Sequence, residues 1–159
     1  MKYYAPKGLN DITPDEMPYW HAVEDEVRKK MPLYGYSEIR TPMMEKTEVF
    51  ARGVGEETDV VSKEMYTFED KGGRSVTLRP ENTASVVRAY LEHKFYGKEE
   101  LSKWYYLGPM FRYEAPQKGR SRQFHQYGAE AIGSNDPALD AEMIDLATDL
   151  LTSLGLQDV

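Results

Sequence analysis

Apolar residues recur every three or four positions in three stretches of the chain, which is the spacing of one face of a helix. We therefore predict helices over residues 13–32, 80–94 and 136–155. Each stretch begins with a helix-start signal. These signals are Thr13-Pro14-Asp15-Glu16, which is a capping box, Pro80-Glu81-Asn82-Thr83 and Asp136-Pro137.

Short runs rich in β-branched and aromatic residues predict strands between these helices. Residues 37–41 form one such run, and Pro42 ends it because proline cannot donate to a central ladder. Residues 65–68 and 75–78 flank the sequence Asp70-Lys71-Gly72-Gly73, whose glycines permit the positive φ of a tight turn. An antiparallel hairpin is the expected result.

A second hairpin is predicted from residues 104–114 and 123–133, with a long polar loop between them. Alternation along its strands brings five side chains to one face: Arg112, Glu114, Phe124, Gln126 and Glu130. Gly128 leaves room on that face, so it suits a ligand. A solvated sheet face accounts for the same pattern, and periodicity alone does not decide between these interpretations.

The loop of this hairpin carries three cationic side chains within five residues, Lys118, Arg120 and Arg122, near Arg112. Arginine forks bind phosphate oxygens in a bidentate manner, so the cluster suits a polyphosphate. A basic loop that is merely exposed to solvent is the alternative interpretation. The sequence lacks the phosphate loops that are built on glycine, because no Walker loop or dinucleotide-binding fingerprint is present.

Composition narrows the class of protein. With 40% hydrophobic and 30% charged residues among 159, the chain is expected to be one soluble globular domain. It has neither an apolar run long enough to span a bilayer nor the apolar stretch of a signal peptide, so we expect no membrane partner and a cytoplasmic location. The net charge of -7 repels polyanions, so nucleic acid would need a local basic patch.

Candidate catalytic and metal-binding groups are few. The chain has no cysteine and only three scattered histidines, which argues against a transition-metal site held by the protein alone. It also has no G-x-S-x-G nucleophile elbow. Chemistry, if present, is therefore expected to depend on positioning and charge.

Several segments resemble the class II aminoacyl-tRNA synthetases. Residues 34–42 are similar to motif 1 of that class, and residues 111–114 with 122–124 are similar to motif 2. Three more segments, residues 52–56, 78–84 and 116–126, resemble the histidine-specific members. The resemblance to histidyl-tRNA synthetases covers nearly the whole chain. It implies an α+β fold in which an antiparallel sheet is flanked by helices, as in part of the class II catalytic core.

The resemblance also implies how histidine would be held. Glu81 and Thr83 would line the histidine pocket, while Gln126 and Glu130 would hold the substrate, with Glu130 at its α-ammonium group. The family's reaction joins histidine to ATP as histidyl-adenylate and then transfers it to tRNA(His).

ATP would be bound by motif 2 residues. Arg112 would contact the α-phosphate and the amino-acid carboxylate, and Arg120 would contact the distal phosphates. Phe124 would stack on adenine, and Glu114 would lie near the adenine or a Mg²⁺ ion. These two arginines are the expected catalytic residues, because charge stabilisation carries such a reaction.

Other parts of the family's pattern are not found in the sequence. Motif 3 and the anticodon-binding domain are missing, so residues 1–159 are expected to be the N-terminal portion of a catalytic domain, with activity in isolation left open. Motif 1 implies a homodimer. Two alternatives remain: a non-catalytic regulatory paralogue, of the ATP phosphoribosyltransferase regulatory subunit type, and a fragment that only dimerises. Retention of the ATP-contacting residues favours the enzyme.

Overall fold

The computed structural model describes residues 2–55, 58, 60–115, 117 and 119–157. The chain forms two compact units, each assembled from three separate segments. The first unit contains Met1–Asp11, Arg40–His93 and Gly108–Gln126. The second contains Ile12–Ile39, Lys94–Leu107 and Tyr127–Val159.

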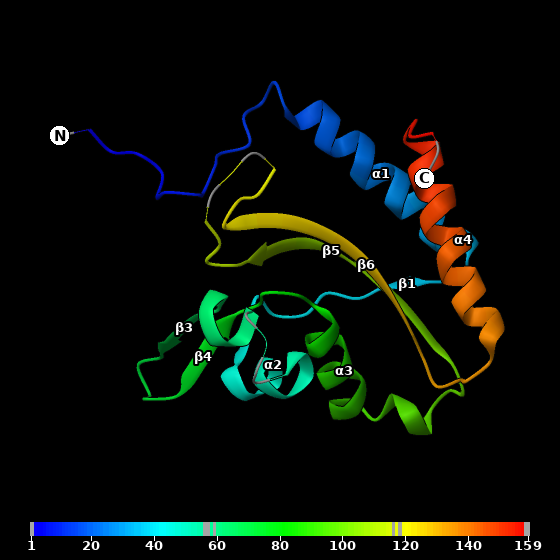
Figure 1. The fold of residues 1–159 in the computed structure, drawn as a ribbon. Coiled ribbons are helices and arrows are strands. Elements are labelled where there is room, and N and C mark those ends of the chain that lie inside the picture. The colour runs from blue at the N-terminus through cyan, green and yellow to red at the C-terminus, as the bar shows by residue number, and fades with distance from the viewer. Residues whose placement is uncertain (1, 56–57, 59, 116, 118, 158–159) are drawn as a thin grey trace. The chain divides into compact units, whose positions relative to one another are not determined.

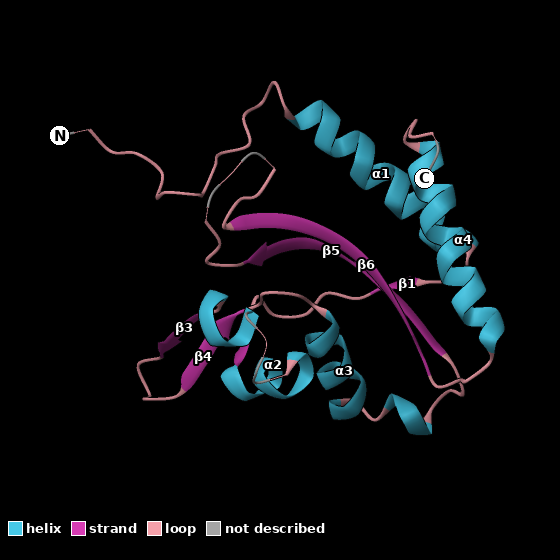
Figure 2. Ribbon diagram, viewed as in Figure 1, coloured by secondary structure: helices cyan, strands magenta, loops and turns pink. Residues whose placement is uncertain are grey.

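An antiparallel sheet of three short strands lies in the first unit. Its order is β2 (Met44–Lys46), β4 (Ser75–Leu78) and β3 (Tyr66–Glu69). The hairpin predicted around residues 70–73 is confirmed, because β3 pairs with β4 from Tyr66 opposite Leu78 to Glu69 opposite Ser75. Figure 2 shows this hairpin with the helices of the same unit.

Local side-chain chemistry explains the hairpin turn. The Asp70 carboxylate accepts hydrogen bonds from the backbone amides of Gly72 and Arg74, at 2.8 and 3.0 Å. Gly73 has a φ of 73°, a left-handed conformation that glycine adopts without steric cost. The amide hydrogen bonds and the Arg74 guanidinium lower the pKa of Asp70.

Two helices pack together in the first unit, α2 (Thr47–Val54) and α3 (Thr83–Glu92), and a π-helical turn follows α2 at Val60–Glu64. Their close approach depends on Gly53, because a Cβ there would lie 2.7 Å from the Cβ of Ala84. Neither α2 nor β2 was predicted. The helix predicted from Pro80 begins three residues later, at Thr83.

The second unit is built on α1 (Met17–Leu33) and α4 (Pro137–Ser153), which lie side by side in Figure 1. A short 3₁₀ turn at Phe95–Gly97 belongs to the same unit. Its buried core combines both helices with two aromatic residues: Val27, Met31, Tyr36, Tyr105, Leu146 and Leu150. Asp136 caps α4 as predicted, since its carboxylate accepts from the Ala138 amide at 2.9 Å.

The capping box predicted at Thr13 is only half formed. The Glu16 carboxylate accepts from the Thr13 amide at 3.0 Å, as expected, but the Thr13 hydroxyl donates to Asp15 and Glu16 instead of accepting from an amide. These carboxylates are stronger acceptors than a hydroxyl, so they occupy the Thr13 side chain in a turn. The helix consequently begins at Met17, four residues later than predicted.

A second sheet has the order β1 (Ser37–Glu38), β5 (Ser102–Phe111) and β6 (Gln123–Ile132). The long hairpin predicted from residues 104–114 and 123–133 is confirmed, but its first strand begins two residues earlier and ends three residues earlier than predicted. β1 is shorter than the predicted strand and pairs with β5 in parallel, with Ser37 opposite Trp104. The fold is therefore α+β and rich in antiparallel pairs, and the pairing of β1 with β5 is the parallel exception among the described strands.

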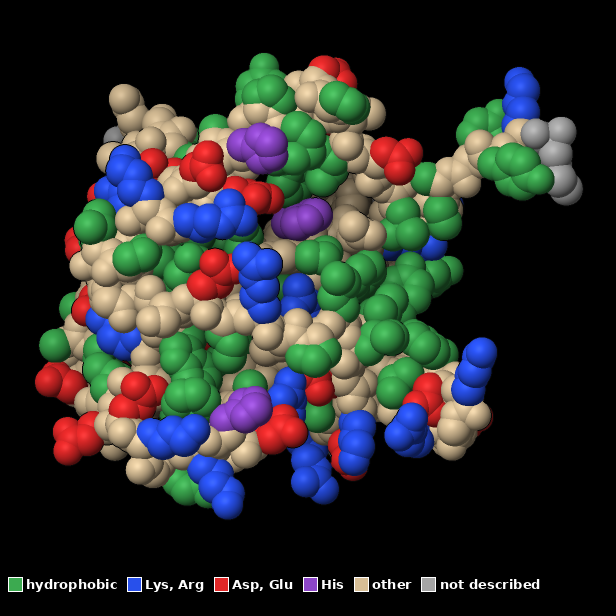
Figure 3. All heavy atoms as spheres, turned by 180° about the vertical axis from the view of Figure 1, so that it is seen from behind, with side chains coloured by type: hydrophobic (Ala, Val, Ile, Leu, Met, Phe, Trp, Pro, Cys, Tyr) green, Lys and Arg blue, Asp and Glu red, His purple; other side chains and the backbone are tan. Residues whose placement is uncertain are grey.

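Among the described residues, no helix is both long and apolar enough to cross a membrane. On the face shown in Figure 3, basic and acidic side chains are interspersed, with hydrophobic side chains between them. A continuous basic surface is not visible on that face.

Candidate functional site

Arg112 lies one residue beyond the end of β5, and three interactions hold it. Its amide donates to the carbonyl of Arg122 at 2.9 Å, which extends the pairing of the two strands. Its Nε donates to the carbonyl of Pro80 at 2.8 Å, and its guanidinium carbon lies 5.3 Å from the centre of the Phe124 ring. The side chain remains 25% exposed, so it is both fixed and accessible.

The carboxylate of Glu114 lies between two arginines. Its Oε2 is 3.2 Å from Nη1 of Arg120, and its Oε1 is 3.9 Å from Nη1 of Arg112. Glu114 is mostly buried, whereas Arg120 is 63% exposed on the loop. Two guanidinium groups thus converge on one carboxylate, and an anion that competes with this carboxylate would find the same donors.

The predicted basic cluster is smaller than the sequence suggested. Arg122 is engaged within the protein: its guanidinium stacks 3.8 Å from the centre of the Tyr113 ring and donates to the carbonyls of Glu114 and Lys7. The prediction that Arg122 contributes to a phosphate clamp is therefore not supported by its contacts. Lys118 lies outside the described residues.

Glu81 holds the start of α3. Its two carboxylate oxygens accept from the amides of Thr83 and Ala84, at 2.6 and 3.0 Å. The Asn82 side chain, at the N-cap position, makes no capping bond to the helix. A carboxylate satisfies two of the exposed helix amides and is stabilised by the positive end of the helix dipole.

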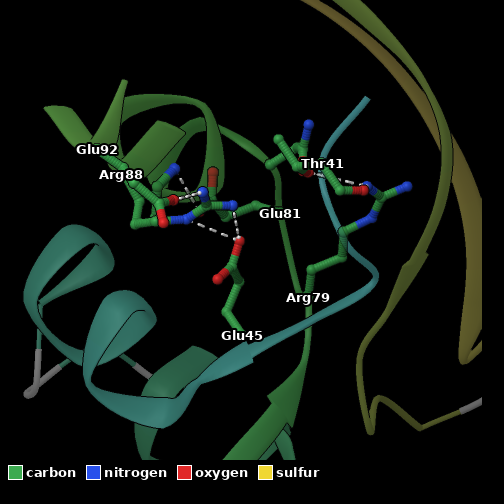
Figure 4. Close-up of polar contacts among 8 residues, drawn as sticks. Thr41, Glu45, Arg79, Glu81, Arg88 and Glu92 are labelled. Carbon is green, nitrogen blue, oxygen red and sulfur yellow. Dashed lines mark hydrogen bonds and ion pairs between the residues drawn. The ribbon is translucent and has the colours of Figure 1, made fainter. Parts of the chain in front are cut away.

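A cavity of about 680 Å³ opens between α2 and α3, and both Glu81 and Thr83 line it. Its floor is largely apolar, formed by Val49, Ala84 and Leu91 among others. At the rim, Arg88 forms ion pairs with Glu45 and Glu92, as Figure 4 shows. The structure therefore brings together two of the four predicted histidine-binding residues.

Gln126 lies on β6 in the first unit and carries a buried carbonyl oxygen. Among the described residues, no donor lies within hydrogen-bonding distance of its Oε1. A buried acceptor without a partner is costly, because it loses its hydrogen bonds to water. It is thus suited to a donor supplied by a ligand.

Glu130 belongs to the second unit, where its Oε1 is 3.5 Å from the hydroxyl of Tyr106. It lines a cavity of about 380 Å³ together with Asp136 and Asp140. The room that Gly128 was predicted to leave for a ligand is filled by the protein. A Cβ at Gly128 would lie 2.8 Å from Cε2 of Tyr106 and nearer still to its Cζ and hydroxyl.

Comparison with known proteins shows the family. The sequence model described as histidyl-tRNA synthetase matches residues 8–159. The chain belongs to this family. This match confirms the resemblance seen in the sequence. Members of this family are enzymes.

Individual histidyl-tRNA synthetases match along all or nearly all of the chain. A histidine–tRNA ligase from Halothermothrix orenii is 64% identical over 159 residues, which is 100% of this chain and 38% of the relative. The apo histidyl-tRNA synthetase of S. aureus is 44% identical, with a TM-score of 0.83 over 98% of this chain and 36% of that one. The chain therefore spans a little over a third of the length of these relatives.

A third match bears on the non-catalytic alternative. The structure titled ATP phosphoribosyltransferase regulatory subunit/histidyl-tRNA synthetase from Bacillus halodurans C is 25% identical, with a TM-score of 0.82 over 98% of this chain and 39% of that one. A protein whose title carries both names thus shares the fold of this chain. The H. orenii and S. aureus proteins are more similar to this chain, at 64% and 44% identity.

The buried side chain of Arg79 in this member of the histidyl-tRNA synthetase family was not predicted from the sequence. Arg79 is only 6% exposed at the end of β4, and its Nε donates to the carbonyl of Pro109 at 2.9 Å. Arginine is rarely buried, so charge alone predicts an exposed side chain. The available signal was its place next to Pro80 and Glu81 in a segment that resembles the histidine-specific members.

Proposed function

We propose that this chain forms the part of a histidine–tRNA ligase that binds ATP and histidine for adenylate formation. The arrangement of Arg112, Glu114, Arg120 and Phe124 is the observation that supports it most. Two guanidinium groups lie on either side of one carboxylate, and one of them also lies against an aromatic ring. Such a group offers donors to a phosphate and a stacking surface to a base.

Arg112 has the central role in this proposal. Attack of the histidine carboxylate on the α-phosphate forms histidyl-adenylate and releases pyrophosphate. Negative charge on the phosphate oxygens changes during that step, and a fixed guanidinium stabilises it without reorganising. Arg120 is exposed on its loop and would reach the distal phosphates, while Phe124 would stack on adenine.

Histidine would be bound by polar groups that the fold already orients. Glu81 and Thr83 line the cavity between α2 and α3, and the buried Oε1 of Gln126 is suited to accept from the ligand. Glu130 completes the proposed set as the partner of the α-ammonium group.

Mg²⁺ would enter with ATP. Among the described residues, no group of three acidic or histidine side chains is placed to hold a metal ion. Mg²⁺ commonly binds through one carboxylate and substrate phosphates, and Glu114 is a carboxylate that fits this arrangement. When bound, the ion would neutralise phosphate charge.

The wider assignments follow from the family. We propose that residues 1–159 correspond to the N-terminal portion of a class II catalytic domain, that the ligase acts on tRNA(His), and that it is a cytoplasmic homodimer joined through motif 1. A regulatory paralogue is the second candidate, because a structure with that title shares the fold. Arg112, Arg120 and Phe124, which such a paralogue would not need, favour the ligase.

Histidine-dependent exchange between ATP and pyrophosphate tests the proposal. The assay would use the chain itself and a chimera in which it replaces the matching 159 residues of the H. orenii relative. We expect exchange in the chimera, and Arg112→Ala should reduce it by about 100-fold or more, as the loss of one oxyanion donor does.

Arg74→Ala is the matched control, because Arg74 is 75% exposed in the hairpin of β3 and β4. It should leave exchange unchanged. A folded chimera that shows no histidine-dependent exchange would contradict the proposed function and favour the regulatory alternative. Equal losses in the two arginine variants would contradict the role of Arg112.

A further inference from the structure

We infer that Arg79 is a positioning residue that sets Arg112 for the reaction, through the carbonyl of Pro80. This inference rests on the proposed function where it concerns catalysis. The carbonyl of Pro80 accepts from Nε of Arg112 at 2.8 Å, so the direction of this carbonyl fixes the guanidinium plane of Arg112. Arg79 is the residue immediately before Pro80 and is buried.

The backbone of Arg79 is held on both sides. Its amide donates to the carbonyl of Met43 at 2.9 Å, and its carbonyl accepts from the amide of Phe111, also at 2.9 Å. Phe111 precedes Arg112, and the Pro80 side chain is fully buried. Residues 79–80 and 111–112 are therefore joined by two consecutive hydrogen bonds, one from a backbone amide and one from the Arg112 side chain.

The guanidinium of Arg79 adds side-chain hydrogen bonds to these backbone contacts. Its Nε donates to the carbonyl of Pro109 at 2.9 Å. Its Nη1 lies 3.2 Å from the hydroxyl of Thr41 and 3.3 Å from Oδ1 of Asn82, and Figure 4 shows its contact with Thr41. One side chain thus ties the end of β5 to the segments before β2 and at the start of α3.

Arginine is required at this position because of its shape. The donors of a guanidinium lie in one rigid plane and reach several acceptors at once, whereas a lysine ammonium is a single point charge on a flexible stem. Gly108 makes room for the plane: a Cβ there would lie 2.7 Å from Nη2 of Arg79. Lysine would keep the charge but lose the connection between Pro109 and Thr41.

Catalysis is sensitive to this kind of support. A displacement of about 1 Å in a group that positions substrate can cost about 100-fold in rate. Without the Arg79 fork, the Pro80 carbonyl and Arg112 would no longer be held in one arrangement. We therefore expect Arg79→Lys to reduce the rate of histidine-dependent exchange between ATP and pyrophosphate by about 100-fold.

A double-mutant cycle with Arg112→Lys separates positioning from general destabilisation. If Arg79 acts through Arg112, the double variant loses no more activity than Arg112→Lys alone. Val86→Ala, a change at a fully buried residue of α3, is the control that lowers stability without altering the Arg112 contacts. If the fold-losses in activity of the two single variants multiply in the double variant, the inference is overturned.

A second readout does not depend on catalysis. The Nε–H proton of Arg112 should exchange slowly with water in the ¹⁵N spectrum of the chain and rapidly after Arg79→Lys, but remain slow after Val86→Ala. If this proton exchanges with water as slowly in Arg79→Lys as in the wild type, the inference is overturned, whatever the enzyme activity. If the wild-type chimera shows no exchange activity while the proton responds as expected, the proposed function fails and the positioning of Arg112 by Arg79 stands.

Discussion

Replacement of Gly128 by alanine offers a direct test of how β6 packs against Tyr106. Its φ does not lie in the left-handed range, so the backbone tolerates alanine and only the added methyl group acts. That methyl would lie 2.8 Å from Cε2 of Tyr106 and closer still to two other atoms of the ring system. Ordinary carbon contacts are about 3.5–4.0 Å, so either the ring or the strand must move.

Overpacking in a folded interior should lower the free energy of unfolding by about 1–3 kcal/mol. For a chain of this size, each kcal/mol lowers Tm by about 2–4 °C. Thermal unfolding followed by circular dichroism should therefore show Gly128→Ala melting about 2–12 °C below the wild type.

Gly97→Ala is the matched control in the same unit, because no described atom beyond Gly97 and its chain neighbours lies within 4 Å of a Cβ placed there. It should leave Tm unchanged or raise it slightly through the entropy of the unfolded chain. Replacing Tyr106 by leucine should remove most of the penalty of Gly128→Ala. A Gly128→Ala variant as stable as the wild type would refute this account of the space at Gly128.

Three further predictions concern stability. Glu81→Ala removes two capping bonds from α3 and should cost about 1 kcal/mol, seen as a lower urea midpoint; an unchanged midpoint would contradict the capping role. The hydrogen bond from Lys30 lowers the pKa of Asp149, so its stabilisation is present above the unfolded pKa of about 3.9 and is lost as pH falls through the lower folded value. Lys30→Met should thus lose less stability than wild type on acidification below about pH 4, and equal losses would argue against the pair. Burial raises the pKa of Tyr36 to about 12, so its stabilisation is present below pH of about 10 and is lost as pH rises to about 12. Tyr36→Phe should therefore lose less free energy of unfolding than the wild type in that interval. Equal losses in the two proteins would contradict the raised pKa of Tyr36.

Local sequence signals predicted those parts of the fold that depend on neighbouring residues. Asp70 and Gly73 form the turn of β3 and β4 through contacts within five residues, and Asp136 caps α4 two residues away. Such interactions can be inferred from sequence because residue type and spacing determine them. The short strand β2 could not be inferred, since only its pairing with β4 makes it a strand.

The candidate site shows the same limit. Alternation along two strands indicated that Arg112, Glu114 and Phe124 share a face, and the structure brings them together. It could not indicate that Tyr106 fills the space beside Gly128, because that depends on which strand face meets which side chain. Nor could it reveal a buried Arg79, whose acceptors are backbone carbonyls and side chains from distant segments.

The pairing of α1 with α4 also has a consequence for biosynthesis. Lys30 and its partner Asp149 are separated by 119 positions, so a ribosome that adds about 5–20 residues per second makes α4 about 6–24 s after α1. Throughout that interval, while the residues between the two helices are being synthesised, Val27 and Met31 have no α4 to cover them. The apolar side of α1 is thus open to aggregation in the nascent chain, and slower translation lengthens the period of risk.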